Sequence, residues 1–317
     1  MKRGGTDICA MLAVDKPAGA SSHDIVNAIR RITGEGRVGH CGTLDPFATG
    51  LLIVNIGPAT RLSDYVMGKS KRYDALIRFG FSTDTDDRTG SPLETGELRE
   101  ELLDKDFAAS LLSGFIGKSM QVPSAFSAKK VDGRRAYELA RNGMGAELKP
   151  VEIEIGEISL ESISRVEDEN GAGILWSVGM EVSKGTYIRA FARDLGMKAG
   201  CPAHLVELRR TAIGNIDLSQ AHSIDEISVD GLRNCFIDPV EACSLARCEV
   251  DAQTASLVGN GSRIGIDRAN LQQERIAIVY DGRMLAIYEA LAEGDPQAAT
   301  RICKPCVVIP GGVEGVR

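Results

Sequence analysis

A single carboxylate inside a glycine-rich loop is the most promising chemical group in this 317-residue chain. Pro46 follows Asp45 and pushes it out of the helical region, so the carboxylate is presented from extended backbone. The surrounding residues 37–52 contain three glycines that permit backbone angles closed to other residues: Gly39, Gly42 and Gly50. We expect no regular helix or strand within this run. An acid held on such a stiff loop is typical of a catalytic nucleophile or base.

The segment directly after the loop is the element that would hold the acid in place. Residues 51–56 are apolar and partly β-branched, which predicts a buried strand. Asp-Pro and glycine-rich sequences are also typical of ordinary surface turns. From these residues alone, a catalytic loop and a plain turn both stay open.

Four motifs follow one another along the chain and separate these alternatives. In order they are Asp15-Lys16-Pro17-x-Gly19-x-Ser21-Ser22, Gly39-His40-x-Gly42-Thr43-Leu44-Asp45-Pro46-x-x-Thr49-Gly50, Lys71-Arg72-Tyr73 and Lys184-Gly185-Thr186-Tyr187-Ile188-Arg189. Together they resemble the TruB family of tRNA pseudouridine synthases, which isomerise the T-loop uridine at tRNA position 55. The resemblance extends from about Met11 to about Ile227. It implies a bacterial, stand-alone isomerase that flips out the uridine and exchanges the C1′–N1 bond for a C1′–C5 bond.

The resemblance also implies roles for six residues. Asp45 would be the catalytic carboxylate and Arg189 its ion-pair partner, since a paired guanidinium favours the ionised acid. Tyr73 would stack on the flipped base. His40 would fill the place that the base vacates, and Leu208 would line the apolar wall of the site. Lys16 would support the catalytic loop from behind.

A basic stretch near residues 120–150 matches the family's RNA-clamping segment, called here the thumb. We expect a basic helix from Gly133 to Asn142, with Lys130 and Arg134 among its phosphate contacts. Phe126 stands where the family often has tyrosine, which removes one hydrogen bond but keeps the ring. A thumb of this form favours a stand-alone enzyme over the RNA-guided relatives.

The resemblance implies an α+β protein with the pseudouridine synthase fold: a mixed, mainly antiparallel sheet with flanking helices and loops. We expect a catalytic domain over 1–238 and a small C-terminal β-domain over 239–317, similar to PUA-type RNA-binding modules. Asp281-Gly282 between two apolar runs is a hairpin signal in that domain. Besides residues 51–56, the predicted strands are 11–14, 73–79, 151–164, 174–183 and 203–210, and alternation in 73–79 places Tyr73, Ala75, Ile77 and Phe79 on one face. One helix is predicted after Ser21 or Ser22, either of which can cap it, with Ile25, Val26, Ile29 and Ile32 on one face at helical spacing. The other predicted helices cover 58–67, 104–115 and 186–198.

The charge distribution permits RNA binding without requiring it. The net charge is −7, but residues 211–317 hold nine basic and fifteen acidic residues, so most of the excess acid lies in the tail. Residues 129–149 carry six basic against three acidic side chains, and residues 184–210 carry six against two. Phosphate binding depends on such local basic surface. We expect tRNA, through its T-arm and elbow, as the partner.

Membrane, metal and cofactor chemistry are not expected. The chain has no apolar stretch of membrane-spanning length and no signal peptide at its start, which predicts a cytoplasmic protein. The isomerisation is redox-neutral and needs no cofactor. The acidic run Thr83–Gly90 does not match the spacing of a calcium loop and indicates a polar turn. Zinc on Cys243, Cys248, Cys303 and Cys306 stays open as a minor alternative, because only the last two form a C-x2-C pair.

Two rival functions also stay open. A tRNA-folding chaperone would bind and remodel the tRNA elbow with only incidental catalysis. An RNA-guided pseudouridine synthase subunit would need protein partners and a guide, whereas the stand-alone enzyme is expected to act as a monomer with no obligatory partner. A glycoside hydrolase is disfavoured because no second carboxylate stands at a comparable site.

Overall fold

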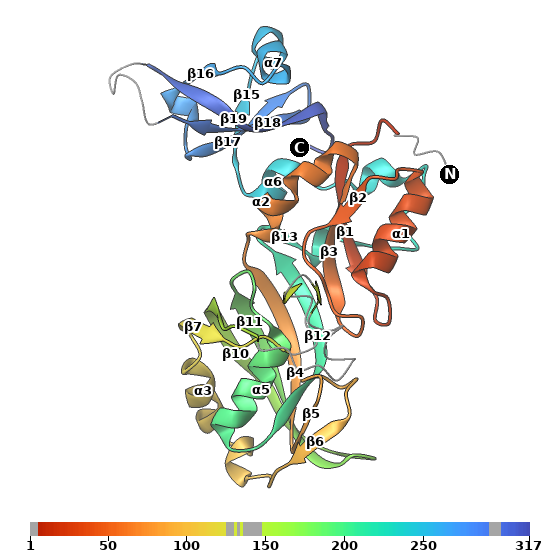
Figure 1. Ribbon diagram of the computed structural model, residues 1–317, viewed down its shortest axis with the longest axis vertical. Coiled ribbons are helices and arrows are strands. Elements are labelled where there is room, and N and C mark those ends of the chain that lie inside the picture. Colours follow the sequence, from red (N-terminus) through yellow and green to blue (C-terminus); the bar gives the residue numbers. More distant parts are fainter. Residues whose placement is uncertain (1–5, 125–129, 132–133, 136–147, 292–298) are drawn as a thin grey trace. The chain divides into compact units, whose positions relative to one another are not determined.

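The computed structural model describes residues 6–124, 130–131, 134–135, 148–291 and 299–317 (Figure 1). The chain divides into two compact units. The first unit comprises Met1–Lys69 and Ala212–Arg317, and the second comprises Ser70–Thr211. Each unit is described separately below. The domain boundary expected at 238/239 stays a prediction.

The loop that carries Asp45 is built on two largely buried strands of the first unit. Strand β1 (Ala10–Lys16) is antiparallel to β3 (Thr49–Ile56), with Leu12 opposite Val54. The short strand β2 (Val38–His40) pairs with the other side of β3, and β14 (His222–Ser223) runs parallel to β1. Both faces of β1 and β3 pack in hydrophobic clusters, which explains their continuous apolar sequence. The buried strand predicted over 51–56 is confirmed.

Helix α1 (Ser22–Thr33) covers one of these clusters. Ser21 caps it in a reciprocal capping box with Asp24, and Gly34 ends it in the left-handed conformation. The buried face presents Ile25, Val26 and Ile29, three of the side chains whose spacing predicted this helix.

The C-terminal part of the chain forms a second sheet in the first unit. Its strand order is β15 (Ala246–Glu249), β17 (Arg275–Tyr280), β18 (Arg283–Ala290), β19 (Thr300–Val313) and β16 (Ile264–Asp267). Asp281 and Gly282 join β17 to β18 with positive φ angles of 49° and 67°, so the predicted hairpin is confirmed. The small β-domain is therefore present, and its kinship with PUA modules stays a prediction.

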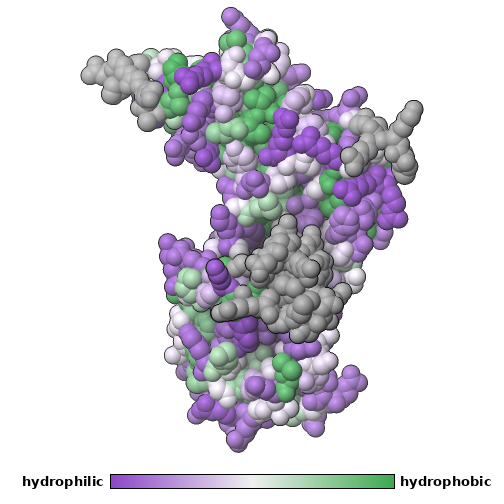
Figure 2. Space-filling model, viewed as in Figure 1, coloured by the Kyte–Doolittle hydropathy of each residue, from purple (hydrophilic) through white to green (hydrophobic). Residues whose placement is uncertain are grey.

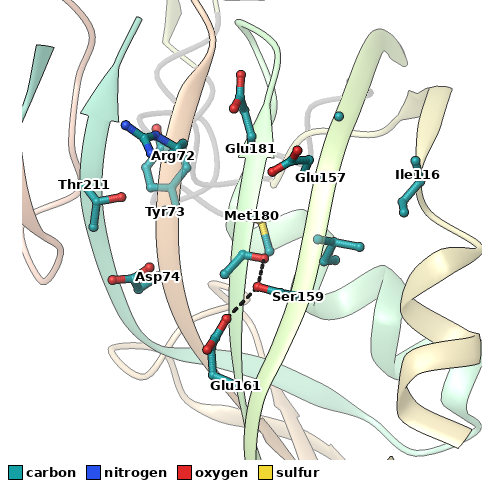
Figure 3. A pocket seen from close by; sticks show the side chains of 13 residues that line it. Arg72, Tyr73, Asp74, Ile116, Glu157, Ser159, Glu161, Met180, Glu181 and Thr211 are labelled. Carbon is teal, nitrogen blue, oxygen red and sulfur yellow. Dashed lines mark hydrogen bonds between the residues drawn. The ribbon is translucent and has the colours of Figure 1, made fainter. Parts of the chain in front are cut away.

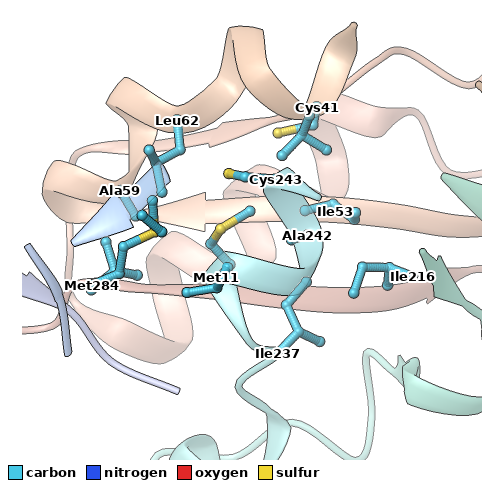
Figure 4. Close-up of a cluster of buried hydrophobic side chains, with 14 of the residues drawn as sticks. Met11, Cys41, Ile53, Ala59, Leu62, Ile216, Ile237, Ala242, Cys243 and Met284 are labelled. Carbon is cyan, nitrogen blue, oxygen red and sulfur yellow. The ribbon is translucent and has the colours of Figure 1, made fainter. Parts of the chain in front are cut away.

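This second sheet shares a core with the N-terminal strands (Figure 4). Met284 of β18 belongs to the same buried cluster as Met11 of β1 and Ile53 of β3. Helix α6 (Pro239–Cys243) places Ala242 and Cys243 among them, beside the helical segments η1 (Gly57–Leu62) and α2 (Ser63–Met67). The C-terminal sheet is thus packed onto the strands that carry the loop.

The second unit is a sheet with helices packed against it. Its strand order is β12 (Ala203–Ile213), β4 (Lys71–Phe79), β11 (Gly171–Val182), β10 (Val151–Asp168) and β7 (Gly117–Gln121). The pairings of β4 with β11, β11 with β10 and β10 with β7 are antiparallel. Helix α5 (Ile188–Ala199) contacts β4, and α3 (Lys105–Ser113) contacts β10 and α5. The predicted strands over 73–79, 151–164, 174–183 and 203–210 and the predicted helices over 104–115 and 186–198 are confirmed.

Shorter elements complete the described residues. They are β5 (Phe81–Thr83), β6 (Pro92–Thr95), η2 (Glu100–Leu103), β8 (Lys130–Val131), β9 (Arg134–Arg135), β13 (Ile216–Asp217), η3 (Leu218–Gln220), η4 (Leu232–Cys235), α7 (Ala252–Gly259) and η5 (Arg268–Asn270). No helix among the described residues is both long and apolar enough to span a bilayer. On the face of the molecule in view, hydrophobic groups form separate small patches on a mainly hydrophilic surface (Figure 2).

The basic helix predicted from Gly133 is wrong at its start. Arg134 and Arg135 form β9, which pairs antiparallel with Lys130 and Val131 of β8. The intervening sequence Asp132-Gly133 is a preferred hairpin dipeptide, and this local signal outweighs the helical one. The remainder of the predicted helix, residues 136–142, lies outside the described residues, as does Phe126.

Candidate active site

The loop that carries Asp45 is shorter than the glycine content suggested. β2 extends to His40 and β3 starts at Thr49, so only residues 41–48 lie between them. Gly42 and Gly50 adopt positive φ angles of 99° and 100°, as expected for their role in the loop. Gly39 is a regular strand residue opposite Asn55, and Gly50 lies in β3, so the expectation that this glycine run holds no regular strand is wrong at both ends. Sheet pairing accounts for this difference.

Asp45 opens a tight turn. Its carbonyl oxygen accepts a hydrogen bond from the Ala48 amide at 3.1 Å, and Pro46 takes the second position of that turn. The Asp45 side chain is half-buried, between the buried residues Leu44 and Phe47. The flanking apolar side chains anchor the turn and leave the acid partly accessible.

Lys16 lies beneath this turn and is fully buried. Its Nζ donates to the carbonyl oxygens of Ala20 at 2.7 Å, Pro17 at 2.9 Å and Pro46 at 3.3 Å. The Gly19 amide also donates to the Pro46 carbonyl, at 2.8 Å. The ammonium thus joins the first motif of the chain to the residue that follows Asp45. This is the supporting contact that the family resemblance implies, and a direct part for Lys16 in substrate binding stays a prediction.

A second clamp acts one residue before Asp45. The Leu44 amide donates to the Ser22 hydroxyl oxygen at 2.9 Å, and that hydroxyl donates to the Leu44 carbonyl at 3.1 Å. Ser22 is the first residue of α1 and is buried. The loop is therefore fixed to β1 on one side of Asp45 and to α1 on the other.

Replacing Lys16 with methionine is expected to lower stability, because the carbonyl groups of Pro17, Ala20 and Pro46 lose their hydrogen bonds to the ammonium. All three hydrogen bonds are part-buried, and Pro46 keeps the Gly19 amide as a donor, so a loss of about 1–2 kcal/mol is expected. Urea unfolding followed by intrinsic fluorescence measures it. Lys118→Met, on exposed β7, is the matched control. Equal urea midpoints for the two variants would show that Lys16 has no such role.

His40 is the last residue of β2 and lies opposite Val54 of β3, which places it directly before the Asp45 loop. Cys41, next to it, is buried and accepts a hydrogen bond from the Asn55 side-chain amide at 3.2 Å. Lys16, His40 and Asp45 are thus brought together by the first unit. Tyr73, Arg189 and Leu208 belong to the second unit, so the pairing of Asp45 with Arg189 stays a prediction.

Arg189 is held in the second unit by a partner that sequence reasoning missed. It lies in the first turn of α5 with only 6% of its surface exposed. Its Nη1 donates to the Thr85 carbonyl at 3.1 Å and lies 3.5 Å from Oδ2 of Asp87. Asp87 is itself only 3% exposed. A buried guanidinium paired with a buried carboxylate is a fixed part of the structure rather than a solvated surface charge.

The loop around Asp87 is built to aim that carboxylate. Oδ1 of Asp87 accepts hydrogen bonds from the Thr89 hydroxyl at 2.6 Å, the Thr85 hydroxyl at 2.8 Å and the Thr89 amide at 2.9 Å. With Oδ1 satisfied inside the loop, Oδ2 faces Arg189. The signal in the sequence is an aspartate flanked at two residues on each side by threonine, a spacing typical of side-chain-stabilised turns. That spacing indicates the turn but not the arginine that its carboxylate meets.

Tyr73 and Leu208 are both largely buried, with 8% and 7% of their surfaces exposed. Tyr73 belongs to the buried row of β4, which starts at Lys71 and continues through Ala75, Ile77 and Phe79, as the alternation predicted for residues 73–79. Leu208 lies on β12. Their contacts with a flipped base stay predictions.

A groove of about 430 Å³ on the second unit includes Tyr73 and Met180 in its lining (Figure 3). One guanidinium, that of Arg72, and four carboxylates line this groove. The carboxylates belong to Asp74, Glu157, Glu161 and Glu181. This surface would repel an RNA backbone, so it does not provide the phosphate contacts expected of a tRNA site.

His204 of β12 is a packed histidine with an ordinary structural partner. Its Nδ1 lies 2.9 Å from the Phe81 carbonyl oxygen, and its ring centroid is 4.4 Å from that of Phe81. Burial lowers the pKa of His204 below its usual 6.5. The neutral ring that results is a structural partner of β5, outside the group of predicted site residues.

The lowered pKa of His204 predicts how stability changes with pH. When the pH is lowered below about 6.5, the unfolded chain takes up a proton on this residue before the folded chain does. The free energy of unfolding should therefore decrease as the pH decreases. One proton contributes at most about 1.4 kcal/mol per pH unit. His204→Asn, which can keep the bond to Phe81, should flatten the difference between pH 7 and pH 5.5 in urea titrations. An unchanged slope would contradict this assignment.

The cysteines do not form a recognisable metal site. Within the described parts of the chain, no group of three or more His, Cys, Asp and Glu side chains could hold a metal ion. Cys243 lies in the cluster shared with β1 and β3, whereas Cys248 and Cys303 lie in the core of the C-terminal sheet. Burial raises the pKa of Cys243 to about 12, which disfavours the thiolate that zinc would require.

Known proteins match this chain over most of its length. Residues 30–188 match the N-terminal domain model of TruB family pseudouridylate synthase, and residues 189–242 match the C-terminal domain of tRNA pseudouridylate synthase B. A protein named tRNA pseudouridine synthase B from Mycobacterium ulcerans is 40% identical over 87% of this chain and 89% of its own. The protein of the same name from Mycobacterium tuberculosis is 38% identical over 95% and 98%, and that from Solibacter usitatus is 44% identical over 68% and 71%.

Solved structures share the fold at lower sequence identity. A Cbf5-Nop10-Gar1 complex aligns with a TM-score of 0.64 and 22% identity, covering 94% of this chain and 85% of the other. An archaeal box H/ACA Nop10-Cbf5 complex aligns with a TM-score of 0.65 and 21% identity, covering 95% and 86%. The expected α+β class with the pseudouridine synthase fold is confirmed. On the matches to its domains and to these relatives, the chain belongs to the TruB family of pseudouridylate synthases.

Proposed function

We propose that this chain is a tRNA pseudouridine synthase that converts uridine 55 of the tRNA T-loop to pseudouridine. The proposal rests on the likeness to relatives named tRNA pseudouridine synthase B, which extends over 95% of this chain and 98% of the Mycobacterium tuberculosis protein. The enzyme is then an isomerase. It breaks the C1′–N1 bond, turns the detached base and rejoins it through C5.

The substrate geometry sets what the site must do. A uridine inside a folded T-loop has to leave its stack before the glycosidic bond can be reached, which costs a few kcal/mol. Tyr73 stacks on the flipped base in this proposal, and His40 fills the space that it leaves. Leu208 lines an apolar wall that keeps water from the detached base.

Asp45 is the proposed catalytic carboxylate. Attack on the sugar, attack on the base and removal of the 2′ proton all need it ionised and aimed. The two clamps supply the aim, because Lys16 and Ser22 hold the backbone immediately after and before it. A fixed orientation lowers the entropic cost of reaching the reactive geometry.

Arg189 is the proposed partner of Asp45. A guanidinium carries five N–H donors in a planar fork, and the Nη1 group of Arg189 meets Thr85 and Asp87. Asp87 fixes the guanidinium from its own unit, so that the fork can present two parallel hydrogen bonds to a second carboxylate. In this proposal Arg189 stabilises the ionised form of Asp45 and fixes the orientation of its carboxylate.

The purified chain and a tRNA transcript test this function directly. Joining C5 to C1′ displaces the hydrogen at C5, so a transcript labelled with tritium at uridine C5 should release one tritium per tRNA into water. No guide RNA or protein partner should be needed, and a transcript with cytidine at position 55 should release none. Release that requires added components would instead favour the RNA-guided subunit, and tRNA folding without release would favour the chaperone.

The remaining proposals concern partners and location. The enzyme acts as a cytoplasmic monomer on the T-arm and elbow of tRNA, with a catalytic domain over 1–238, a thumb near 120–150 and an RNA-binding C-terminal domain over 239–317. Light scattering of the chain alone and with tRNA gives the stoichiometry. A stable dimer in both samples would contradict the monomer.

Lys130→Ala and Arg134→Ala are expected to weaken tRNA binding, because each removes one proposed phosphate interaction of the thumb. The slope of log K against log salt should become shallower by about 0.7–0.9 for each phosphate that is no longer neutralised. Filter binding at several salt concentrations measures this slope. Lys105→Ala on α3 is the control and should leave the slope unchanged. Equal slopes of log K against log salt for the parent and all of these variants would show that Lys130 and Arg134 make no phosphate contact.

A further inference from the structure

Arg193, one turn after Arg189 on α5, joins three segments of the second unit. Its Nη2 donates to the carbonyl oxygen of Val122, just beyond the end of β7, at 2.8 Å. Its Nη1 lies 3.4 Å from Oδ2 of Asp86, in the loop after β5. Nε and Nη2 also donate to Oδ1 of Asp194 at 2.9 Å and 2.8 Å. One guanidinium therefore connects a strand end, a loop and a helix.

Asp86 occupies a demanding position between the two residues that hold Arg189. Thr85 before it provides the carbonyl group that Arg189 contacts, and Asp87 after it provides the carboxylate. Asp86 itself has a φ angle of 60°, a left-handed conformation that few residues other than glycine, asparagine and aspartate adopt. Its carbonyl oxygen accepts from the Leu205 amide at 3.0 Å. A shift of Asp86 would move both contacts of Arg189 together.

The end of β7 is tied to the same region by three more hydrogen bonds. The Gln121 side chain donates to the Tyr187 carbonyl at 3.1 Å and accepts from the Tyr187 amide at 2.9 Å, directly before α5 begins. The Ser124 hydroxyl donates to the Thr85 carbonyl at 3.2 Å, the same oxygen that Arg189 contacts. Beyond Ser124 the chain continues toward Lys130, a proposed phosphate contact of the thumb. The end of β7 thus links that segment to the Arg189 loop.

We propose that Arg193, paired with Asp86, is a positioning residue that fixes the Arg189–Asp87 pair and ties it to the end of β7. The inference rests on the proposed function, in which Arg189 orients Asp45. In this proposal Arg193 itself does not contact the nucleotide. Arg193 acts through the backbone of the loop that holds Asp86 and Asp87, and through the end of β7, which leads into the thumb.

The two side chains are mostly buried, with 26% of Arg193 and 13% of Asp86 exposed. Removing one partner of a buried ion pair also lowers stability, because the other charge is left without its partner. A small displacement of a residue that orients a reacting group can in addition reduce the rate up to about 100-fold. The rates of the variants are therefore compared at a temperature at which urea unfolding shows each of them to be folded.

Single-turnover tritium release from the labelled transcript tests the proposal in Arg193→Gln, Asp86→Asn and the double variant. Asparagine is chosen because it tolerates the left-handed backbone. Each single variant should lower the rate constant about 10-fold, with the tRNA dissociation constant within about twofold of the parent. The double variant should show no larger decrease than the worse single one, because the two residues act as a unit. Arg193→Lys should recover part of the rate.

Arg165→Gln is the matched control, because it removes an exposed ion pair with Glu100 in the same unit. Unchanged rates in Arg193→Gln and Asp86→Asn, or decreases that add fully in the double variant, would overturn the proposal. Should Arg193→Gln fail to fold, Asp86→Asn decides alone. A parent protein that releases no tritium would instead refute the proposed function itself, so the two failures are distinguishable.

Discussion

Asp45→Asn is expected to abolish pseudouridine formation while tRNA still binds. Asparagine has nearly the same shape as aspartate but cannot act as a nucleophile or base, so the reaction loses the group that all three candidate mechanisms require. A fall of at least about 1,000-fold in the single-turnover rate is expected, equivalent to about 4 kcal/mol in the barrier. The dissociation constant for tRNA should stay within a few-fold, because phosphate contacts elsewhere supply most of the affinity.

Asp74→Asn is the matched control, because this exposed aspartate of β4 has no proposed part in catalysis or RNA binding. Its rate should equal that of the parent. Turnover by Asp45→Asn within tenfold of the parent would remove Asp45 from the chemistry. A strain that carries Asp45→Asn and grows like the parent under stress would favour the tRNA-folding role.

Arg189→Lys is expected to have the second largest effect. Lysine keeps the positive charge but loses the planar fork, so it cannot hold Asp87 and a second carboxylate in fixed directions at once. We expect the single-turnover rate to fall about 100-fold with little change in tRNA binding. Asp87→Asn should lower the rate as well, because the arginine then loses its charged partner while the threonine contacts to Oδ1 can persist.

Arg99→Lys provides the control for this pair of variants. Arg99 forms an exposed ion pair with Glu101 in the same unit, so the same chemical change there should leave the rate unaffected. Equal rates for Arg189→Lys and the parent would show that the fork geometry is not used. A large decrease of tRNA binding in Arg189→Lys would assign the arginine to RNA contact instead.

Local patterns in the sequence were enough to predict the strands and helices that carry the site. The apolar run at 51–56 predicted β3 because both faces of this strand are buried. A cap at Ser21 or Ser22 and the helical spacing of the isoleucines predicted α1, and the Asp281-Gly282 pair predicted the β17–β18 hairpin. In each case the information lies within a few residues of the element itself.

Contacts between distant residues could not be predicted in the same way. Asp87 stands in a polar run typical of a solvated turn, and its burial depends on Arg189, about a hundred residues later. The hairpin of β8 and β9 replaced the start of a predicted helix because the basic residues fit both patterns. The core shared by the C-terminal sheet and β1 likewise depends on packing between residues more than 250 positions apart in the sequence, such as Met11 and Met284. Composition does not reveal such contacts.

A structure of this chain with a T-arm RNA that carries 5-fluorouridine at position 55 tests the central claim most directly. The account predicts the target nucleotide outside its stack, one Asp45 oxygen within about 3–3.5 Å of its ribose or base, and the Arg189 guanidinium paired with that carboxylate. An Asp45 side chain that faces open solvent away from the nucleotide, or an Arg189 that contacts only Asp87 and Thr85, would contradict it.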